Sequence, residues 1–381
     1  MKLVLFIAPF YNRCGITDNY HNFFSACNKS EKSNNITFKV FNYFDEFNHL
    51  KKKYIIQNPL KFNFVFRFLE QKIPWLYYRI WMILVFVHLQ VVLPIVINQQ
   101  QKKYSEVIIV SQMSTIAVAF VSLYFSFNKN VKFYVWIAGL VYKNFLRKLI
   151  WQNILKNYKG IVIPTNDMRK NISNWTNSKR IYEIPNPLLT DEMKKLKKKN
   201  FIYKSNNIFK VVCIGRLSRQ KGFDVLIKAI SEISDVKLDI IGDGEEKIKL
   251  TKLKKELCAD NKINFLGWKH KPWKSLKNYD LFVMPSRWEG PGHTVIEALC
   301  QNIPVIVSDC KYGPKETIKN GKYGIYFKKD DVAGLRRKII KVKNNYHIYK
   351  KKSLEGGSFI RNYYSTEKII EKYIKMFLKN N

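Results

Sequence analysis

Short runs of apolar residues alternate with helix-length segments along the whole chain. Runs of this kind are typical of buried strands, and their alternation with helices indicates parallel sheets covered by helices. The run at residues 1–10 is predicted to be a first strand and not a signal peptide, because it is short and lacks a small-residue cleavage site. Strands are predicted at 3–8, 36–41, 106–110, 132–136 and 160–163 in the first half, and at 210–214, 237–241, 263–266, 281–284 and 305–307 in the second.

The length of the chain and one proline-containing segment predict two domains. A chain of 381 residues is too long for one compact core. The segment from Ile181 to Leu188 contains two prolines and an Asn, which suit a short, stiff connector. We therefore expect a domain boundary near Asn186.

The most hydrophobic stretch runs from Trp75 to Ile97 and includes Arg79 and Pro94. It approaches the length of a membrane span, but a central charge is costly in a bilayer. Two interpretations remain. The preceding aromatic and basic residues favour a surface helix that lies among lipid headgroups. The alternative is a buried helix that leads into the strand at Val107.

The composition is strongly basic. The chain has 67 Lys and Arg against 29 Asp and Glu, a formal charge of +38, which indicates an anionic partner: nucleic acid, acidic lipid or a phosphorylated substrate. Part of this lysine reflects a general compositional bias towards Lys, Asn and Ile. The 46% hydrophobic content excludes a disordered chain, and the six cysteines contain no CxxC pair, which predicts buried thiols in a reducing compartment.

Two carboxylates flank a Pro/Gly turn in the second half of the chain. Glu289 and Glu297 stand eight positions apart, between a predicted strand and a predicted amphipathic helix. In an open α/β sheet, ligands bind at the carboxyl ends of the strands, and a helix N-terminus there offers N–H groups to an anion. A phosphate site is one interpretation. The other needs no ligand, because Thr294 followed by Glu297 is also a capping box, and Pro291 and Gly292 are ordinary turn residues.

A second strand, loop and helix favours the interpretation as a site. After the strand at 210–214, Gly215 allows a sharp turn, and Arg216 and Lys221 lie in the loop. The following helix has an apolar stripe from Phe223 to Ile233. Two fixed cations at the same sheet edge as the carboxylates could hold a diphosphate and stabilise it as it leaves.

The chain resembles the family-4 retaining glycosyltransferases of the GT-B class, of the bacterial surface-polysaccharide type. The resemblance rests on residues 215–222, 241–244, 263–267 and 304–316 and on the Glu289/Glu297 motif, which together cover most of the C-terminal half. The N-terminal half matches more loosely, through Gly15 and residues 184–187. The resemblance implies two Rossmann-like, doubly wound domains that face each other across a cleft.

The resemblance also implies a domain plan. Residues 1–185 would be an N-terminal, acceptor-side domain with a membrane-associating surface, and residues 186–363 the domain that binds the nucleotide sugar. Residues 364–381 would form a helix that crosses back to the first domain. The protein would be cytoplasmic and peripheral on the inner face of the plasma membrane.

Site roles follow from the same resemblance. Arg216 and Lys221 would bind the donor diphosphate, Glu289 the hydroxyls of the transferred sugar, and Glu297 the ribose. Glu289, Arg216 and Lys221 are the expected catalytic residues. The donor would also be bound by Gly15 in the first loop and by Gly292, His293 and Thr294, whose backbone amides suit a sugar or phosphate.

The expected reaction is retaining transfer of a hexose or N-acetylhexosamine from a nucleotide sugar, preferably a UDP-sugar, to a glycan on a polyprenyl diphosphate. No metal and no cofactor are expected, because the two cations would neutralise the leaving group and no Asp-x-Asp stands at a strand end. The alternatives are a UDP-sugar epimerase of the same fold and a basic nucleic-acid-binding protein. The latter lacks any recognition motif, so no nucleic-acid partner is expected.

Overall fold

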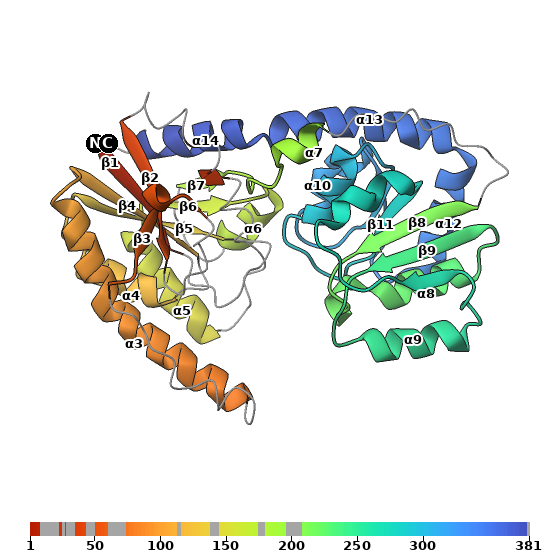
Figure 1. Ribbon diagram of the computed structural model, residues 1–381, viewed down its shortest axis with the longest axis horizontal. Helices are drawn as coiled ribbons and strands as arrows, with labels where there is room; N and C mark the ends of the chain where they lie inside the picture. The colour runs from red at the N-terminus through yellow and green to blue at the C-terminus, as the bar shows by residue number, and fades with distance from the viewer. Residues whose placement is uncertain are drawn as a thin grey trace. The chain divides into compact units, whose positions relative to one another are not determined.

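The computed structural model describes residues 1–7, 23–24, 27, 35–42, 50–59, 74–112, 116–137, 145–173, 180–195 and 208–378. The chain divides into two compact units (Figure 1). Unit 1 comprises Met1–Pro164, Arg169–Pro187 and Thr366–Asn381, and unit 2 comprises Thr165–Met168 and Leu188–Ser365. The main change of unit after Pro187 lies two residues beyond the boundary expected after residue 185.

Unit 1 is built on a seven-stranded sheet in which every strand pairing is parallel. The strand order is β3-β2-β1-β4-β5-β6-β7, so the order reverses between β1 and β4. The strands are β1 (Lys2–Ile7), β2 (Ile36–Asn42), β3 (Ile55–Gln57), β4 (Glu106–Gln112), β5 (Val131–Trp136), β6 (Gly160–Ile163) and β7 (Ile181–Glu183).

Helices cover both faces of this sheet. The C-terminal helix α14 (Thr366–Leu378) buries Ile369, Tyr373 and Phe377 in one core with β1, β2, β4 and β5. Helices α3, α4 and α5 lie on the other side (Figure 1). The other helices are α3 (Pro74–Gln101), α4 (Ile116–Tyr124), α5 (Phe145–Ile154) and α6 (Asp167–Ser173), with the short 3₁₀ turns η1 (Lys52–Tyr54) and η2 (Leu155–Asn157).

Unit 2 has a six-stranded parallel sheet with the order β10-β9-β8-β11-β12-β13. This is the doubly wound order of a Rossmann domain, and its switch point lies between β8 and β11. The strands are β8 (Phe209–Ile214), β9 (Val236–Ile241), β10 (Ile263–Phe265), β11 (Leu281–Met284), β12 (Val305–Ser308) and β13 (Ile325–Phe327).

Two apolar clusters of unit 2 pack the helices onto this sheet. Helix α8 buries the predicted stripe from Phe223 to Ile230, and Ile233 continues it just past the end of the helix. The helices are α7 (Asp191–Lys195), α8 (Phe223–Ser231), α9 (Lys247–Glu256), α10 (His293–Cys300), α11 (Pro314–Thr317), α12 (Val332–Asn344) and α13 (Tyr346–Tyr363), with 3₁₀ turns η3 (Arg219–Lys221), η4 (Pro272–Asn278) and η5 (Lys319–Gly321).

All ten predicted strands are confirmed to within two residues at each end over the part of the chain that is described. Three short edge strands, β3, β7 and β13, were not predicted. The prediction that the connector begins at Ile181 is wrong, because Ile181–Glu183 pairs with β6 as β7. The prediction that the cysteines are buried is wrong for Cys258, which is exposed after the end of α9.

Candidate active site

The two predicted motifs meet at the switch point of the unit 2 sheet. Strand β8 pairs directly with β11. The basic loop at 215–222 follows β8, and the acidic loop at 285–292 follows β11. Since both strands are parallel, both loops leave the same carboxyl edge, where an open α/β sheet binds its ligands.

An ion pair joins these loops. Lys221 Nζ lies 2.5 Å from Glu289 Oε1, and Ser286 Oγ donates to the same oxygen at 2.8 Å. The Glu289 side chain is 8% exposed and that of Lys221 21%, so solvent screens this pair less than a surface pair. A cation and a carboxylate predicted separately therefore form one unit in the free protein.

Glycines give Lys221 its position. A Cβ on Gly215 would lie 3.3 Å from two carbons of the Lys221 side chain, so the lysine lies directly over Gly215. Gly222 has φ of +65° and approaches Pro285 so closely that a Cβ would meet its carbonyl oxygen. The reason predicted for Gly215 is therefore corrected: the required positive φ is at Gly222, and Gly215 provides room.

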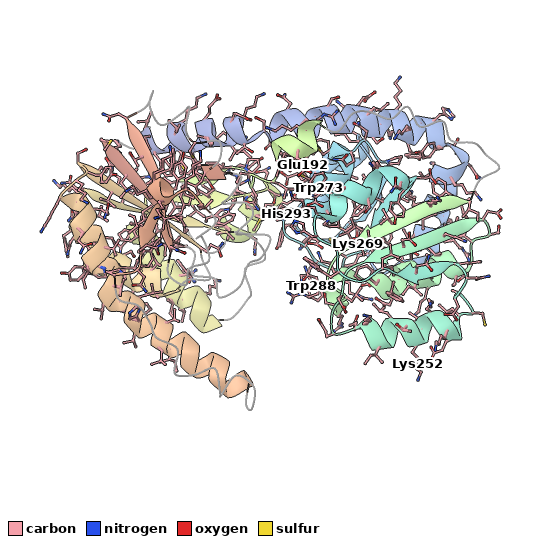
Figure 2. All side chains as sticks on the ribbon, viewed as in Figure 1. Glu192, Lys252, Lys269, Trp273, Trp288 and His293 are labelled. Carbon is pink, nitrogen blue, oxygen red and sulfur yellow. The ribbon has the colours of Figure 1, made fainter. Side chains whose placement is uncertain are left out.

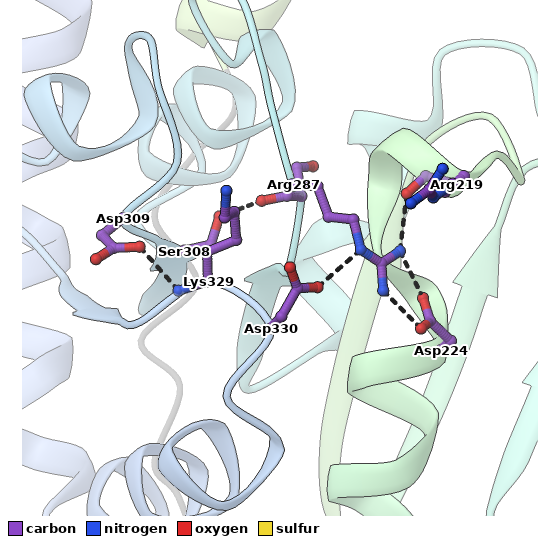
Figure 3. Close-up of polar contacts among 8 residues, drawn as sticks. Arg219, Asp224, Arg287, Ser308, Asp309, Lys329 and Asp330 are labelled. Atoms are coloured by element: carbon purple, nitrogen blue, oxygen red, sulfur yellow. Dashed lines mark hydrogen bonds and ion pairs between the residues drawn. The ribbon is translucent and has the colours of Figure 1, made fainter.

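Arg287 holds the two loops together (Figure 3). Its Nη atoms donate to both carboxylate oxygens of Asp224 on α8, at 2.9 and 2.7 Å, and its Nε lies 2.7 Å from Asp330 Oδ1. Its Nη1 also donates to the carbonyl of Arg219. The pKa of the guanidinium is raised mainly by its hydrogen bond with Asp224. A planar guanidinium suits such a fork.

Backbone contacts extend the same connection. The N–H of Arg287 donates to the carbonyl of Gln220 at 2.7 Å, and Gln220 Nε2 donates to the carbonyl of Trp288 at 2.9 Å. Ser308 Oγ on β12 donates to the Ser286 carbonyl at 2.5 Å. The three residues before Glu289 are thus held before any ligand arrives. Ser286, Arg287 and Ser308 were not predicted as site residues from the sequence.

Helix α10 starts directly after the acidic loop. Gly292 is its N-cap, with φ of +69°, and His293 is the first helical residue (Figure 2). The capping-box interpretation is wrong, because Thr294 lies inside the helix and makes no cap hydrogen bond. Thr294 Oγ1 and Glu297 Oε2 are buried with no hydrogen-bond partner among the described residues. Both polar atoms therefore have unused hydrogen-bonding capacity.

Burial sets the charge state of two groups on α10. It raises the pKa of the Glu297 carboxyl from 4.5 to about 8. It also lowers the pKa of the His293 imidazole from 6.5 to about 4; the nearby Glu289 carboxylate opposes this shift, and Lys221 adds a smaller lowering. At neutral pH Glu297 is mostly protonated and His293 is neutral.

Arg216 differs from Lys221. Its side chain is exposed, and within the described part of the chain it makes no hydrogen bond or ion pair. The two predicted cations are therefore not equivalent before a ligand binds. Gly15, the predicted donor-binding residue of the first loop, lies outside the described residues.

The arrangement combines cations, hydroxyl-binding carboxylates and a helix N-terminus at one sheet edge. Lys221 and Arg216 can bind an anion, and the first N–H groups of α10 have no intrahelical acceptor. Glu289 and Glu297 can accept hydrogen bonds from vicinal hydroxyls. A ligand that carries both phosphate and sugar groups fits this chemistry.

Residues 192–355, which lie within unit 2, match the family model described as "Glycosyl transferases group 1" and form a domain of this family. An uncharacterized glycosyltransferase of Methanocaldococcus jannaschii is 33% identical over 248 residues, 57% of this chain and 61% of that protein. A poly(ribitol-phosphate) alpha-N-acetylglucosaminyltransferase of Staphylococcus aureus is 28% identical over 234 residues, 60% of this chain and 46% of that protein. The chain thus spans between about half and three fifths of the length of these curated relatives.

Solved structures resemble the chain over its full length. The lipopolysaccharide outer core galactosyltransferase WaaB has a TM-score of 0.73 at 17% identity, with 100% of both chains covered. The Anabaena protein HepE, solved in complex with UDP, has a TM-score of 0.72 at 14% identity, again with 100% of both chains covered. At these identities the likeness concerns the fold. It confirms the predicted GT-B class.

Proposed function

We propose that this chain, in which residues 192–355 form a glycosyl transferases group 1 domain, is a retaining glycosyltransferase of bacterial surface-glycan synthesis. The donor is a UDP-sugar that carries a hexose or N-acetylhexosamine, and the acceptor is a lipid-linked glycan. One observation carries the proposal: Lys221 and Glu289 meet at the switch point of the unit 2 sheet, in a loop that leads into α10, the helix that carries the buried Oε2 of Glu297. Phosphate-binding and hydroxyl-binding groups stand there together.

The proposed reaction exchanges one bond at the anomeric carbon. The bond from C1 to the diphosphate oxygen breaks, and a bond from C1 to the acceptor oxygen forms on the same face. The acceptor proton moves to the leaving diphosphate, so that UDP and a glycoside result. Lys221 and Arg216 stabilise the negative charge that develops on the leaving group. These fixed cations support a reaction that needs no divalent metal.

Glu289 has a different role in this proposal. Its carboxylate accepts hydrogen bonds from the hydroxyls of the transferred sugar, and its negative charge favours the oxocarbenium-like character that develops at C1. Ser286 holds the carboxylate by a hydrogen bond, and Arg287 holds the loop that carries it, before the donor binds. Such preorganisation reduces the reorganisation that the transition state would otherwise require.

Glu297 and Thr294 serve the ribose. Both bring a buried polar atom without a hydrogen-bond partner among the described residues, and a ribose diol can supply the missing hydrogen bonds. The uridine nucleotide is supported by the UDP bound in the Anabaena structure. The lipid-linked acceptor and a peripheral position on the inner face of the plasma membrane are supported by the net charge of +38.

Transfer assays with purified full-length protein test the proposal. A panel of UDP-, GDP- and ADP-sugars is offered with a bacterial lipid extract as acceptor source, with and without EDTA. We expect one UDP-sugar to label the lipid fraction at equal rates in both conditions, with release of UDP. Interconversion of free UDP-sugars without transfer would favour the epimerase. Loss of all transfer with EDTA would refute metal independence, and no reaction with any donor would refute the proposed activity.

A further inference from the structure

Helix α3 is apolar on the side where a surface helix is normally polar. Its inner row, from Val85 through Leu89 to Ile97, is buried in unit 1. Its outer row consists of Ile83, Val87, Val91 and Ile95, and Ile83 is 63% exposed. The spacing of four residues places this row along one side of the helix.

Helix α4 continues the exposed apolar surface. The rings of Phe86 and Phe120 contact each other edge to face at 5.4 Å, and Gln90 Nε2 donates to the Ala117 carbonyl, so the two helices are joined along their length. From Phe120 the surface runs on to Phe127, which is 98% exposed. We call the outer rows of both helices, together with Phe127 just after the end of α4, the α3/α4 face; its members are Ile83, Val87, Val91, Ile95, Phe120, Leu123, Tyr124 and Phe127.

Exposed lysines stand at the end of this face. Lys102 and Lys103 follow α3, and Lys129 follows Phe127 by two residues. Asn128 Nδ2 donates to Gln101 Oε1 at 3.4 Å, which ties the turn that carries Phe127 and Lys129 to the end of α3. An aromatic side chain and cations therefore occupy one edge of the unit.

The surrounding sequence is almost free of negative charge. Residues 71–166 contain eleven Lys and Arg but a single acidic residue, Glu106. That carboxylate is already engaged by Lys2 at 3.2 Å and by Lys132 at 3.1 Å. An apolar surface of this kind, set in a region of uncompensated positive charge, fits a partner that is apolar inside and anionic at its surface.

We propose that the α3/α4 face docks on an anionic phospholipid bilayer, with Phe127 inserted among the acyl chains and Lys102, Lys103 and Lys129 at the phosphate groups. This inference rests on the proposed function and names the surface that brings the enzyme to a lipid-linked acceptor. By length and composition alone, Ile83–Gln101 would also pass as a spanning helix. Its buried inner row belongs to the core of unit 1, which favours a helix that lies on the membrane.

A second copy of the chain is a poorer occupant. A twofold contact through the α3/α4 face would bring the lysines of one copy close to those of the other. Like charges in an interface are costly, and no described acidic residue of α3 or α4 offsets them. The bilayer supplies the opposite charge.

The experiment is flotation of the full-length protein with vesicles of phosphatidylcholine alone or with 30% phosphatidylglycerol, without donor or acceptor. We expect binding only to the anionic vesicles. Phe127→Ser should weaken it by about tenfold, and Lys102→Gln/Lys103→Gln/Lys129→Gln by up to about a hundredfold. The changed residues are exposed, so both variants should melt like the parent protein.

Matched controls lie on α9 of unit 2. Ile248 is 85% exposed, so Ile248→Ser removes a comparable apolar side chain, and Lys247→Gln/Lys249→Gln/Lys252→Gln removes the same charge. Both should bind vesicles like the parent. Equal losses in the α9 and α3/α4 variants would show that only net charge matters and would overturn the proposed face. The proposed docking on a bilayer would also be overturned if light scattering showed that the parent protein is a dimer and that Phe127→Ser is a monomer.

Vesicle binding is measured without any glycosyl transfer, so it can fail or succeed independently of the enzymatic activity. If vesicles bind as expected but no donor reacts, the docking surface stands and the proposed activity falls. If transfer to lipid occurs while Phe127→Ser and the triple lysine variant bind vesicles like the parent, the activity stands and the surface is wrong.

Discussion

Affinity for the donor should rise between pH 7 and pH 9 because of Glu297. Burial raises the pKa of this carboxyl to about 8, and its Oε2 has no hydrogen-bond partner among the described residues. In the free protein at pH 7, about one molecule in ten has the ionised carboxylate, whereas at pH 9 about nine in ten have it. Since the ribose diol donates hydrogen bonds, the ionised form is the one that binds it best.

The expected magnitude follows from these fractions. If only the ionised form binds, the apparent Kd equals the intrinsic Kd divided by the ionised fraction. The Kd should then fall about tenfold from pH 7 to pH 9 and level off above that. The affinity rises with pH because the pKa of the carboxyl is raised in the free protein and the ligand, which prefers the ionised form, lowers it. The neutral His293, with a pKa of about 4, adds no titration in this range.

Isothermal titration with an intact UDP-sugar is the assay, because its diphosphate has no further proton to lose in this range. Glu297→Gln is the control: the amide cannot ionise, so its Kd should stay constant from pH 7 to pH 9. A parent protein with equal affinity at both pH values would refute the role of the carboxylate. The same would follow if the Gln variant kept the full pH dependence.

Three substitutions probe the remaining parts of the site. Glu289→Gln should lower kcat, measured by initial rates, by at least about a hundredfold. Its affinity for UDP, measured by titration, should be no weaker than that of the parent, because Lys221 is released from its carboxylate partner. Arg216→Ala should raise the donor KM or lower kcat in the same assay, yet change the unfolding free energy in urea by less than about 0.5 kcal/mol, since the side chain is exposed. Arg287→Lys should lower stability by about 1–3 kcal/mol and reduce kcat, because an ammonium cannot reproduce the fork to Asp224; an unchanged melting temperature and kcat would contradict this.

The sequence predicted the parts of the fold that carry a strong local pattern. Long apolar strands such as β1 and β4 stand out against their polar surroundings, and so do the stripe of α8 and the two motif loops. The short strands β3, β7 and β13 have three residues each, too few to show a period. Strand β10 is as short, but it was predicted as part of the longer run 263–266. Their pairing depends on neighbours that are distant in sequence. Strand β7 was not predicted because it lies in a segment whose prolines indicated a connector.

The charge state of the site was less accessible to sequence reasoning. The sequence spacing of Thr294 and Glu297 matches a capping box, and only the position of Gly292 as N-cap shows that the helix starts two residues too early for it. The pKa of Glu297 depends on how completely α10 is covered, which is a property of packing. Residue type and spacing located the carboxylate but did not indicate that it is mostly protonated at neutral pH.

The contacts of Arg287 explain why the chemistry of this site could be predicted from motifs while its rigidity could not. Arg287 stands two residues before Glu289 and binds Asp224 and Asp330, which lie 63 residues before it and 43 residues after it in the sequence. In a chain so rich in basic residues, nothing marks this arginine as different. Yet the loop that carries Glu289 is attached through it to α8, and the ion pair with Lys221 forms between loops already held together. The pair is therefore positioned by the fold, and in the proposed reaction a diphosphate that displaced Glu289 from Lys221 would meet an ammonium that is already in place.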